Sequence, residues 1–226
     1  MLYVGLVLGV TAGNMAAHAG RLDALRVRLS TLILIVPALV GARLLYAVAE
    51  WPRYRQNICR IWDRHDGGSI MYGGLAAALP VSVPLLRILH LSFPAFWDAA
   101  SFTILVGMFF TRIGCLMNGC CAGRPSLRWG LYLPNHAAVR ERRIPTQLLE
   151  SVWAAILVIS AVRVRGTAPF PGALFLMTSF GYSAGRLGME SLRERRQTSA
   201  RFSVAHVLSL VIAVVSISIL TIYWRK

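Results

Sequence analysis

The amino-acid sequence predicts an all-α fold, that of a polytopic membrane protein with about seven transmembrane helices. Of the 226 residues, 56% are hydrophobic and 15% are charged, whereas soluble domains carry about 25% charged residues. The mean hydropathy is +0.59. The apolar stretches do not alternate between apolar and polar residues, which favours helices over the strands of a membrane barrel. These observations exclude a disordered tail, a small disulfide-rich secreted protein and an ordinary soluble enzyme.

Seven apolar stretches are long enough, or nearly so, to cross about 30 Å of hydrocarbon. In chain order they cover residues 2–19, 29–50, 70–91, 94–110, 147–162, 170–186 and 203–224. We expect the first to be a retained helix rather than a cleaved signal peptide, because no basic residue precedes it. The two longest connections, 51–69 and 111–146, hold too little apolar sequence for a soluble domain. One integral-membrane domain over residues 1–226 is therefore predicted.

The basic residues are almost all arginine. Of 24 basic residues 23 are arginine, and the formal net charge is +15. Nucleic-acid-binding proteins usually mix lysine with arginine and lack seven apolar segments, so no nucleic-acid partner is predicted. Arginine pairs well with phosphate, which suggests anionic lipid headgroups as partners. The alternative is codon bias together with arginines that anchor helix ends at the membrane surface.

The arginines also bear on orientation. The connections after the second, fourth and sixth stretches carry 15 arginines, and the other face carries 8 basic residues. The positive-inside rule would therefore place these three connections in the cytoplasm. Arginines with a functional role are not topological signals, so charge alone does not decide the orientation.

The four cysteines do not form a recognisable metal site. Three of them, Cys115, Cys120 and Cys121, are close in sequence, and Cys59 is distant. Zinc sites usually combine two pairs with short spacers, and this spacing fits poorly. Small residues in tight packing are the favoured interpretation, with a disulfide or a reactive thiol as the alternative. We predict no metal and no cofactor.

Four polar clusters lie inside or beside the apolar stretches, where an ionisable group is costly and indicates function. They cover residues 66–75, 111–126, 144–150 and 182–193. In the last cluster, Arg186, Glu190 and Arg193 share one helix face by their spacing, so Glu190 can orient two guanidinium groups. A salt-bridge ladder on a surface helix is the alternative.

The second cluster combines Gly114, Gly119 and Gly123 with the flanking residues Arg112 and Arg124. A glycine-rich turn between arginines could cradle a phosphate. The alternative is a loop that re-enters the interface while its arginines extend to the water.

These clusters, in this order, resemble the bacterial prolipoprotein diacylglyceryl transferases. The resemblance covers nearly the whole chain and rests on six motifs in register. They are G-A-R-L at 41–44, D-G-G and G-G-L within 66–75, R-I-G, N-G and G-R within 112–124, W-G and P within 129–134, P-T-Q-L and E within 145–150, and R-x-x-x-E-x-x-R at 186–193.

The resemblance implies a seven-helix enzyme of the bacterial cytoplasmic (inner) membrane that needs no cofactor. The family transfers the diacylglyceryl group of phosphatidylglycerol to the lipobox cysteine thiol of a prolipoprotein and releases glycerol phosphate. Its partners would be phosphatidylglycerol, the prolipoprotein lipobox and the lipid bilayer. The family's catalytic face lies outside the cytoplasm, opposite to the orientation that the charge count favours, and we adopt the family orientation.

The resemblance also assigns site residues. The catalytic residues would be Arg112, Arg186 and Tyr72: the two arginines would hold the phosphate and stabilise its developing charge, and Tyr72 would hydrogen-bond or orient the lipid. The alternative for Tyr72 is an aromatic anchor at the membrane interface. Substrate binding would involve Arg43, Asn118, Gly123, Arg124, Gln147, Glu150, Glu190 and Arg193.

Within that set, Glu190 would position Arg186. Gln147 and Glu150 would either bind polar groups of the substrate or tie helices together.

The chain also departs from the family pattern. Tyr72 stands where the family has a histidine, Cys115 replaces an asparagine, Cys120 replaces an acidic residue and Ile144 replaces a histidine. These changes keep two rivals open: a non-catalytic lipid-binding or chaperone paralogue, and a transferase with another acceptor. A transporter or flippase is suggested only by the intramembrane polar groups.

Overall fold

The computed structural model describes residues 1–63, 68–120, 123–128, 130–134, 140–192 and 204–224. Within these residues, seven helices are at least 18 residues long. They are α1 (Leu2–Ala19), α2 (Ala24–Ala49), α4 (Met71–Ile88), α5 (Phe93–Met117), α6 (Thr146–Val164), α7 (Ala173–Glu190) and α8 (Val204–Trp224). The shorter elements are α3 (Trp51–Tyr54), η1 (Ile58–Trp62), η3 (Arg165–Thr167), β1 (Leu131–Pro134) and β2 (Arg140–Arg143).

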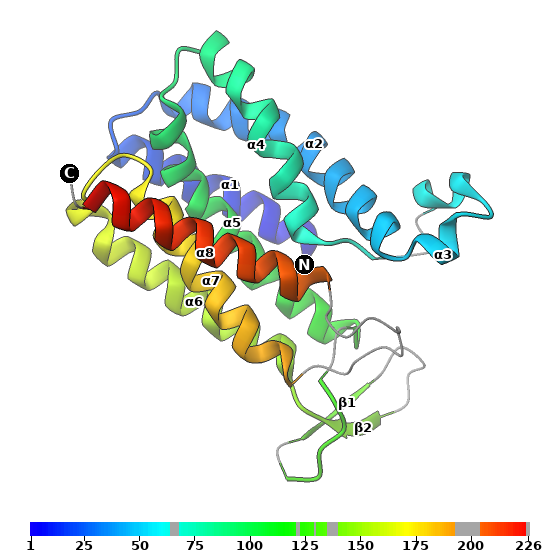
Figure 1. Cartoon of the computed structure of the whole chain (residues 1–226). Helices are drawn as coiled ribbons and strands as arrows, with labels where there is room; N and C mark the ends of the chain where they lie inside the picture. The colour runs from blue at the N-terminus through cyan, green and yellow to red at the C-terminus, as the bar shows by residue number, and fades with distance from the viewer. Residues whose placement is uncertain (64–67, 121–122, 129, 135–139, 193–203, 225–226) are drawn as a thin grey trace.

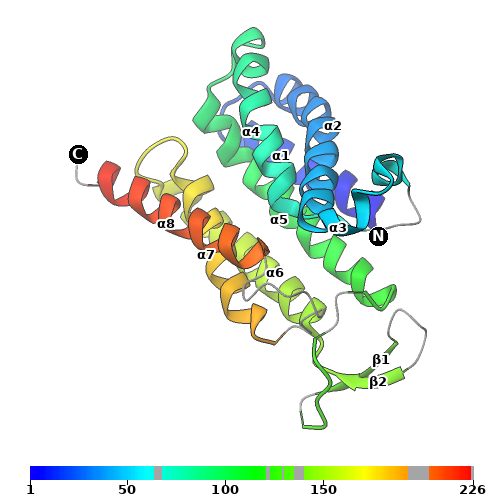
Figure 2. The same cartoon turned by 45° about the vertical axis from the view of Figure 1, so that its right-hand side comes forward.

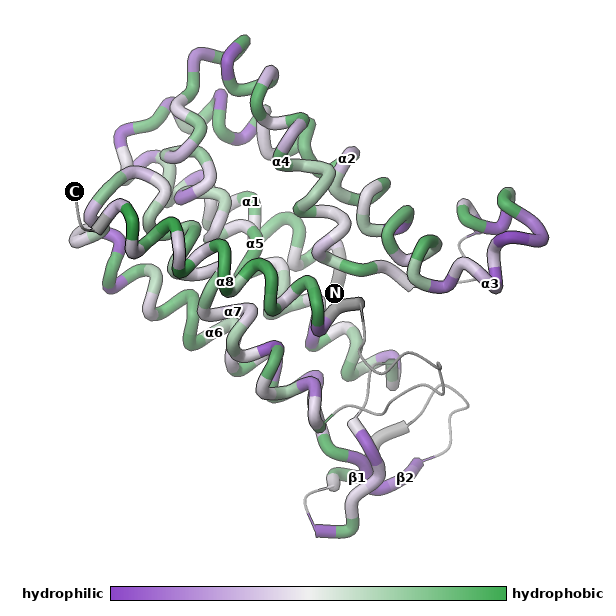
Figure 3. Tube along the Cα trace, viewed as in Figure 1, coloured by the Kyte–Doolittle hydropathy of each residue, from purple (hydrophilic) through white to green (hydrophobic). Residues whose placement is uncertain are grey.

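The prediction of an all-α membrane fold is confirmed. In the described part of the chain, five helices are long and apolar enough to cross a membrane, namely α2, α4, α5, α6 and α8. Figure 3 shows hydrophobic residues along the long helices and hydrophilic residues at α3 and at β1 and β2. The two strands form one antiparallel sheet, which the sequence analysis did not predict.

Two helix boundaries differ from the prediction in a way that matters for the site. The helix expected over 94–110 runs on to Met117, because residues 111–117 contain no proline and only one glycine. Arg112 and Gly114 are therefore part of a helix, rather than of a glycine-rich turn. The helix expected over 170–186 runs from Ala173 to Glu190, so Glu190 is helical as well.

Helix α5 connects two groups of helices (Figures 1 and 2). Helices α2 and α4 run side by side, and α1 packs along both α2 and α5. On the other side α7 lies between α6 and α8, and α5 contacts both α6 and α7. The buried core includes Phe96, Trp97 and Leu105 of α5 together with Leu86 of α4 and Leu157 of α6.

Helices α2 and α4 approach so closely that glycine is required where they meet. A Cβ added at Gly41 would collide with the carbonyl oxygen of Gly73 and the Cβ of Ala77. Just before α4, the backbone N–H of Ile70 donates to the carbonyl oxygen of Ala42 (3.0 Å). The glycine contact therefore fixes the start of α4, and with it the position of Tyr72.

We expect Gly41→Ala to lower the free energy of unfolding by roughly 1–3 kcal/mol, because the added methyl group overpacks the α2–α4 contact. Thermal and chemical unfolding of the protein in detergent would measure this. Gly166→Ala is the matched control, since nothing lies within 4 Å of its added Cβ. Equal effects of the two substitutions would contradict this account of the contact.

Candidate functional site

Two carboxylates and two guanidinium groups form a connected network at one end of the helix bundle. Glu150 Oε2 is 2.5 Å from Arg112 Nε, and Glu150 Oε1 accepts a hydrogen bond from Arg186 Nη1 at 2.7 Å. Arg186 Nη2 is 3.3 Å from Glu190 Oε2. Only 2% of the Glu150 side chain is exposed. Glu150 therefore holds both arginines that the sequence analysis placed in the active site.

The helix directions explain why these residues meet. Arg112 lies near the end of α5, Glu150 near the start of α6 and Arg186 near the end of α7. These three helix ends lie at the same end of the bundle as β1 and β2 (Figure 1). The spacing of Arg186 and Glu190 had predicted their pairing. No local spacing links residues 112, 150 and 186, so the sequence analysis missed Glu150 as the shared partner.

The guanidinium groups of this network are chemically suited to bind an anion. A guanidinium carries five N–H donors in a planar fork and stays protonated, so it can bind a carboxylate and a phosphate oxygen together. Two formal positive charges face two negative charges here. The network is formally neutral, and a phosphate would meet guanidinium groups that buried Glu150 and half-buried Glu190 already orient.

Gln147 and Gly123 shape the chain around the network. Gln147 Nε2 donates to the carbonyl oxygen of Cys120 at 2.7 Å and so ties α6 to the segment after α5. The N–H of Gly123 donates to the carbonyl oxygen of Ile144 (3.0 Å). A Cβ at Gly123 would meet the carbonyl oxygens of Ile144 and Leu192, so this position accommodates only glycine. Between the two open interpretations of Gln147, its contact favours joining helices.

Other predicted site residues lie apart from the network. Arg43 of α2 donates to the carbonyl oxygens of Ile61 (2.6 Å), Asp63 (2.9 Å) and Gly68 (2.9 Å). It therefore organises the segment between α2 and α4. Asn118 and Arg124 are exposed on the segment that follows α5.

Arg193 and Cys121 lie outside the described residues. Cys59 is an exposed free thiol. Cys115 and Cys120 are half-buried, and Cys120 Sγ is 3.6 Å from the carbonyl oxygen of Cys115.

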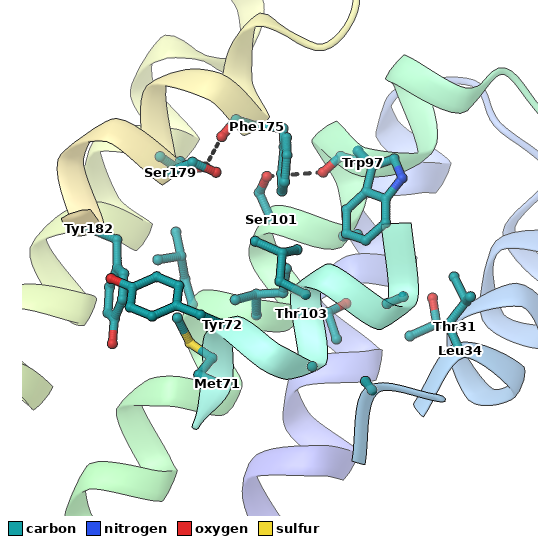
Figure 4. A pocket seen from close by; sticks show the side chains of 18 of the residues that line it. Thr31, Leu34, Met71, Tyr72, Trp97, Ser101, Thr103, Phe175, Ser179 and Tyr182 are labelled. Carbon is teal, nitrogen blue, oxygen red and sulfur yellow. Dashed lines mark hydrogen bonds between the residues drawn. The ribbon is translucent and has the colours of Figure 1, made fainter. Parts of the chain in front are cut away.

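Tyr72 lies in the first turn of α4 and is 6% exposed. Its hydroxyl shares a 2.6 Å hydrogen bond with Ser209 Oγ of α8. Its ring meets the ring of Tyr182 edge-on, with centroids 6.4 Å apart (Figure 4). Tyr182 precedes Arg186 by one turn of α7, so Tyr72 lies near the network without belonging to it.

A cavity of about 330 Å³ opens beside this tyrosine pair. Figure 4 shows Tyr72 and Tyr182 at one end and Trp97 with Phe175 at the other. Helices α2, α4, α5 and α7 supply most of its lining, and the side chains are predominantly apolar.

The chain matches the family model described as prolipoprotein diacylglyceryl transferase over residues 1–222. The phosphatidylglycerol–prolipoprotein diacylglyceryl transferase of Listeria innocua is 32% identical over 204 residues, which cover 86% of this chain and 73% of the relative. The protein of the same name from Bacillus cytotoxicus is 32% identical over 189 residues, which cover 80% of this chain and 70% of the relative.

We expect Glu150→Gln to destabilise the protein by roughly 3–5 kcal/mol, because it leaves two buried guanidinium groups without their shared carboxylate. Unfolding in detergent would measure the loss. Glu141→Gln is the matched control: its pair with Arg143 (2.8 Å) has a 42% exposed carboxylate, and such pairs contribute about 0–1 kcal/mol. If Glu150→Gln were no worse than the control, the network would not support the packing of α5, α6 and α7.

Proposed function

Because the chain belongs to the prolipoprotein diacylglyceryl transferase family, we propose that it transfers the diacylglyceryl group of phosphatidylglycerol to a cysteine thiol of a prolipoprotein. Glycerol phosphate is the second product. The acceptor is the lipobox cysteine at the signal peptide, and the enzyme spans the cytoplasmic membrane of a bacterium with its site outside the cytoplasm. The joint contact of Arg112 and Arg186 with buried Glu150 carries this proposal.

The reaction substitutes sulfur for a phosphate oxygen at a glycerol carbon. The cysteine thiol gives up its proton, the thiolate sulfur bonds to the terminal carbon of the diacylglyceryl group, and the bond from that carbon to the phosphate oxygen breaks. Glycerol phosphate leaves with the electron pair. Negative charge therefore grows on the phosphate in the transition state, where oriented donors lower the barrier. A free thiol titrates near pH ~8.5, so modest help from a base suffices.

Arg112 and Arg186 hold the phosphate and stabilise its growing charge. Glu150 is a positioning residue, since its two oxygens orient one guanidinium each. Glu190 positions Arg186 from the other side. Because these contacts exist before the lipid binds, little reorganisation is needed when the charge develops.

The remaining residues act around this centre. Asn118 and Arg124, both exposed, contact the substrates at the same end of the bundle. The resemblance gives Arg193 a substrate-binding role as well. Gly123 and Gln147 shape the backbone beside the network.

Arg43 acts through the backbone of the segment before α4, whose carbonyl oxygens it binds. Tyr72 orients the lipid through its hydroxyl.

Replacing Arg112 or Arg186 by alanine should lower transfer by about one to two decades, since a charge-assisted hydrogen bond contributes roughly 1.5–3 kcal/mol. Purified protein, labelled phosphatidylglycerol and a lipobox peptide provide the assay. Arg163→Ala is the control, because Arg163 is exposed at the far end of α6. Binding of the labelled lipid without any product from the wild-type chain would indicate a non-catalytic lipid-binding paralogue instead.

Tyr72→Phe removes the hydroxyl, and we expect transfer to fall about five- to tenfold, the size of one hydrogen bond. Ser209→Ala is the informative comparison, since it removes the partner of this hydroxyl but keeps the hydroxyl itself. A role in orienting the lipid predicts that Ser209→Ala stays near the wild-type rate. Equal losses in the two variants, with equal losses of thermal stability, would instead make Tyr72 a helix-joining residue.

A further inference from the structure

The apolar cavity leads away from the ion-pair network along the helix axes. Its lining on α7 extends from Ser183, three residues before Arg186, to Phe175. Arg186 and Phe175 are eleven residues apart, which is about 16 Å along an α-helix. A lipid with its phosphate at Arg186 would therefore point a chain into this cavity.

Trp97 of α5 lies at the end of the cavity away from the tyrosine pair (Figure 4). Trp97 is 4% exposed, and its Nε1–H donates to Ser82 Oγ of α4 at 3.2 Å. Its ring centroid lies 5.0 Å from that of Phe175 and 5.7 Å from that of Phe96. These contacts hold the indole in place, and we call it the floor of the cavity.

The floor is also anchored through the start of α7. The carboxylate of Asp98 accepts hydrogen bonds from the backbone N–H groups of Gly172 (2.7 Å) and Phe175 (2.9 Å). Phe175 is therefore held at its backbone by α5, the helix that also carries Trp97. Trp97 and Phe175 are thus both held by α5, and together they set the depth of the cavity.

We propose that this cavity receives one acyl chain of the diacylglyceryl group and that Trp97 sets the longest chain that the enzyme uses. The inference rests on the proposed function. A cavity of about 150 Å³ with apolar walls holds one benzene molecule, and this cavity is about 330 Å³. It thus has room for one chain, and the second chain stays in the bilayer.

Several hydroxyls of the lining are already bonded within their own helices, which favours a hydrocarbon chain over a peptide segment, although the hydroxyls of Thr103 and Ser183 are buried without such a bond. Thr31 donates its hydroxyl to the carbonyl oxygen of Val27 (2.8 Å), and Ser101 donates to that of Trp97 (3.0 Å). These hydroxyls satisfy carbonyl groups of their own helices. A peptide would bring backbone N–H and C=O groups that need partners, whereas an acyl chain needs none.

The test compares donors of different chain length. Dimyristoyl, dipalmitoyl, distearoyl and diarachidoyl phosphatidylglycerol are presented in detergent micelles to the purified full-length protein with a lipobox peptide. The wild-type rate should drop beyond one chain length. Trp97→Ala should raise the ratio of long-chain to short-chain transfer by roughly tenfold, because accommodating a few methylene groups in an apolar pocket changes the relative rate by about this factor. Trp62→Ala, which removes an exposed tryptophan of η1, should leave the ratio unchanged.

Ala100→Leu tests the same idea in the opposite direction. Ala100 lines the cavity on α5 and is 7% exposed, so a leucine there shortens or narrows it. The ratio of long-chain to short-chain transfer should fall roughly tenfold, and this variant carries the test if Trp97→Ala does not fold. Transfer with an unchanged ratio in the folded variants would overturn the inference and leave the proposed function standing. No transfer by the wild-type protein from any donor would overturn the proposed function itself.

Discussion

The structure depends on one buried carboxylate, that of Glu150, held between the guanidinium groups of Arg112 and Arg186. Removing an ion from water costs several kcal/mol, and close opposite charges must offset this cost. Glu150 can therefore be buried only if the ends of α5, α6 and α7 come together. The same requirement brings two arginines to one place, which is what a phosphate ester needs. The contacts that hold the three helix ends together are therefore the same ones that orient the arginines proposed to bind the phosphate.

Helix α7 is held at both ends, and this links the two parts of the proposed lipid site. Asp98 binds the backbone N–H groups of Gly172 and Phe175 at its start, and Glu150 binds Arg186 near its end. A rigid helix then sets the distance between the phosphate-binding arginine and the aromatic floor. In the proposed lipid site, one helix, α7, therefore contacts both the headgroup and the acyl chain.

The departures from the family pattern fall around the network rather than within it. The arginines and both of their carboxylates are present, whereas Tyr72, Cys115 and Cys120 occupy positions where the family has other residues. The Tyr72 hydroxyl shares a hydrogen bond with Ser209 of α8, a contact that the sequence does not reveal. The residues proposed to bind the phosphate therefore match the family pattern, whereas Tyr72, which is proposed to orient the lipid, departs from it.

The sequence by itself determined the membrane class, the approximate positions of seven long helices, the family and the two arginines, because hydropathy and short motifs are local properties. It also predicted that Arg186 pairs with Glu190, since four residues make one helical turn. Only the tertiary structure decided that Glu150 joins Arg112 to Arg186, that Arg43 binds a neighbouring loop, and that a cavity ends at Trp97. These features depend on how separate helices pack, and no spacing along the chain encodes which side chains meet across such contacts.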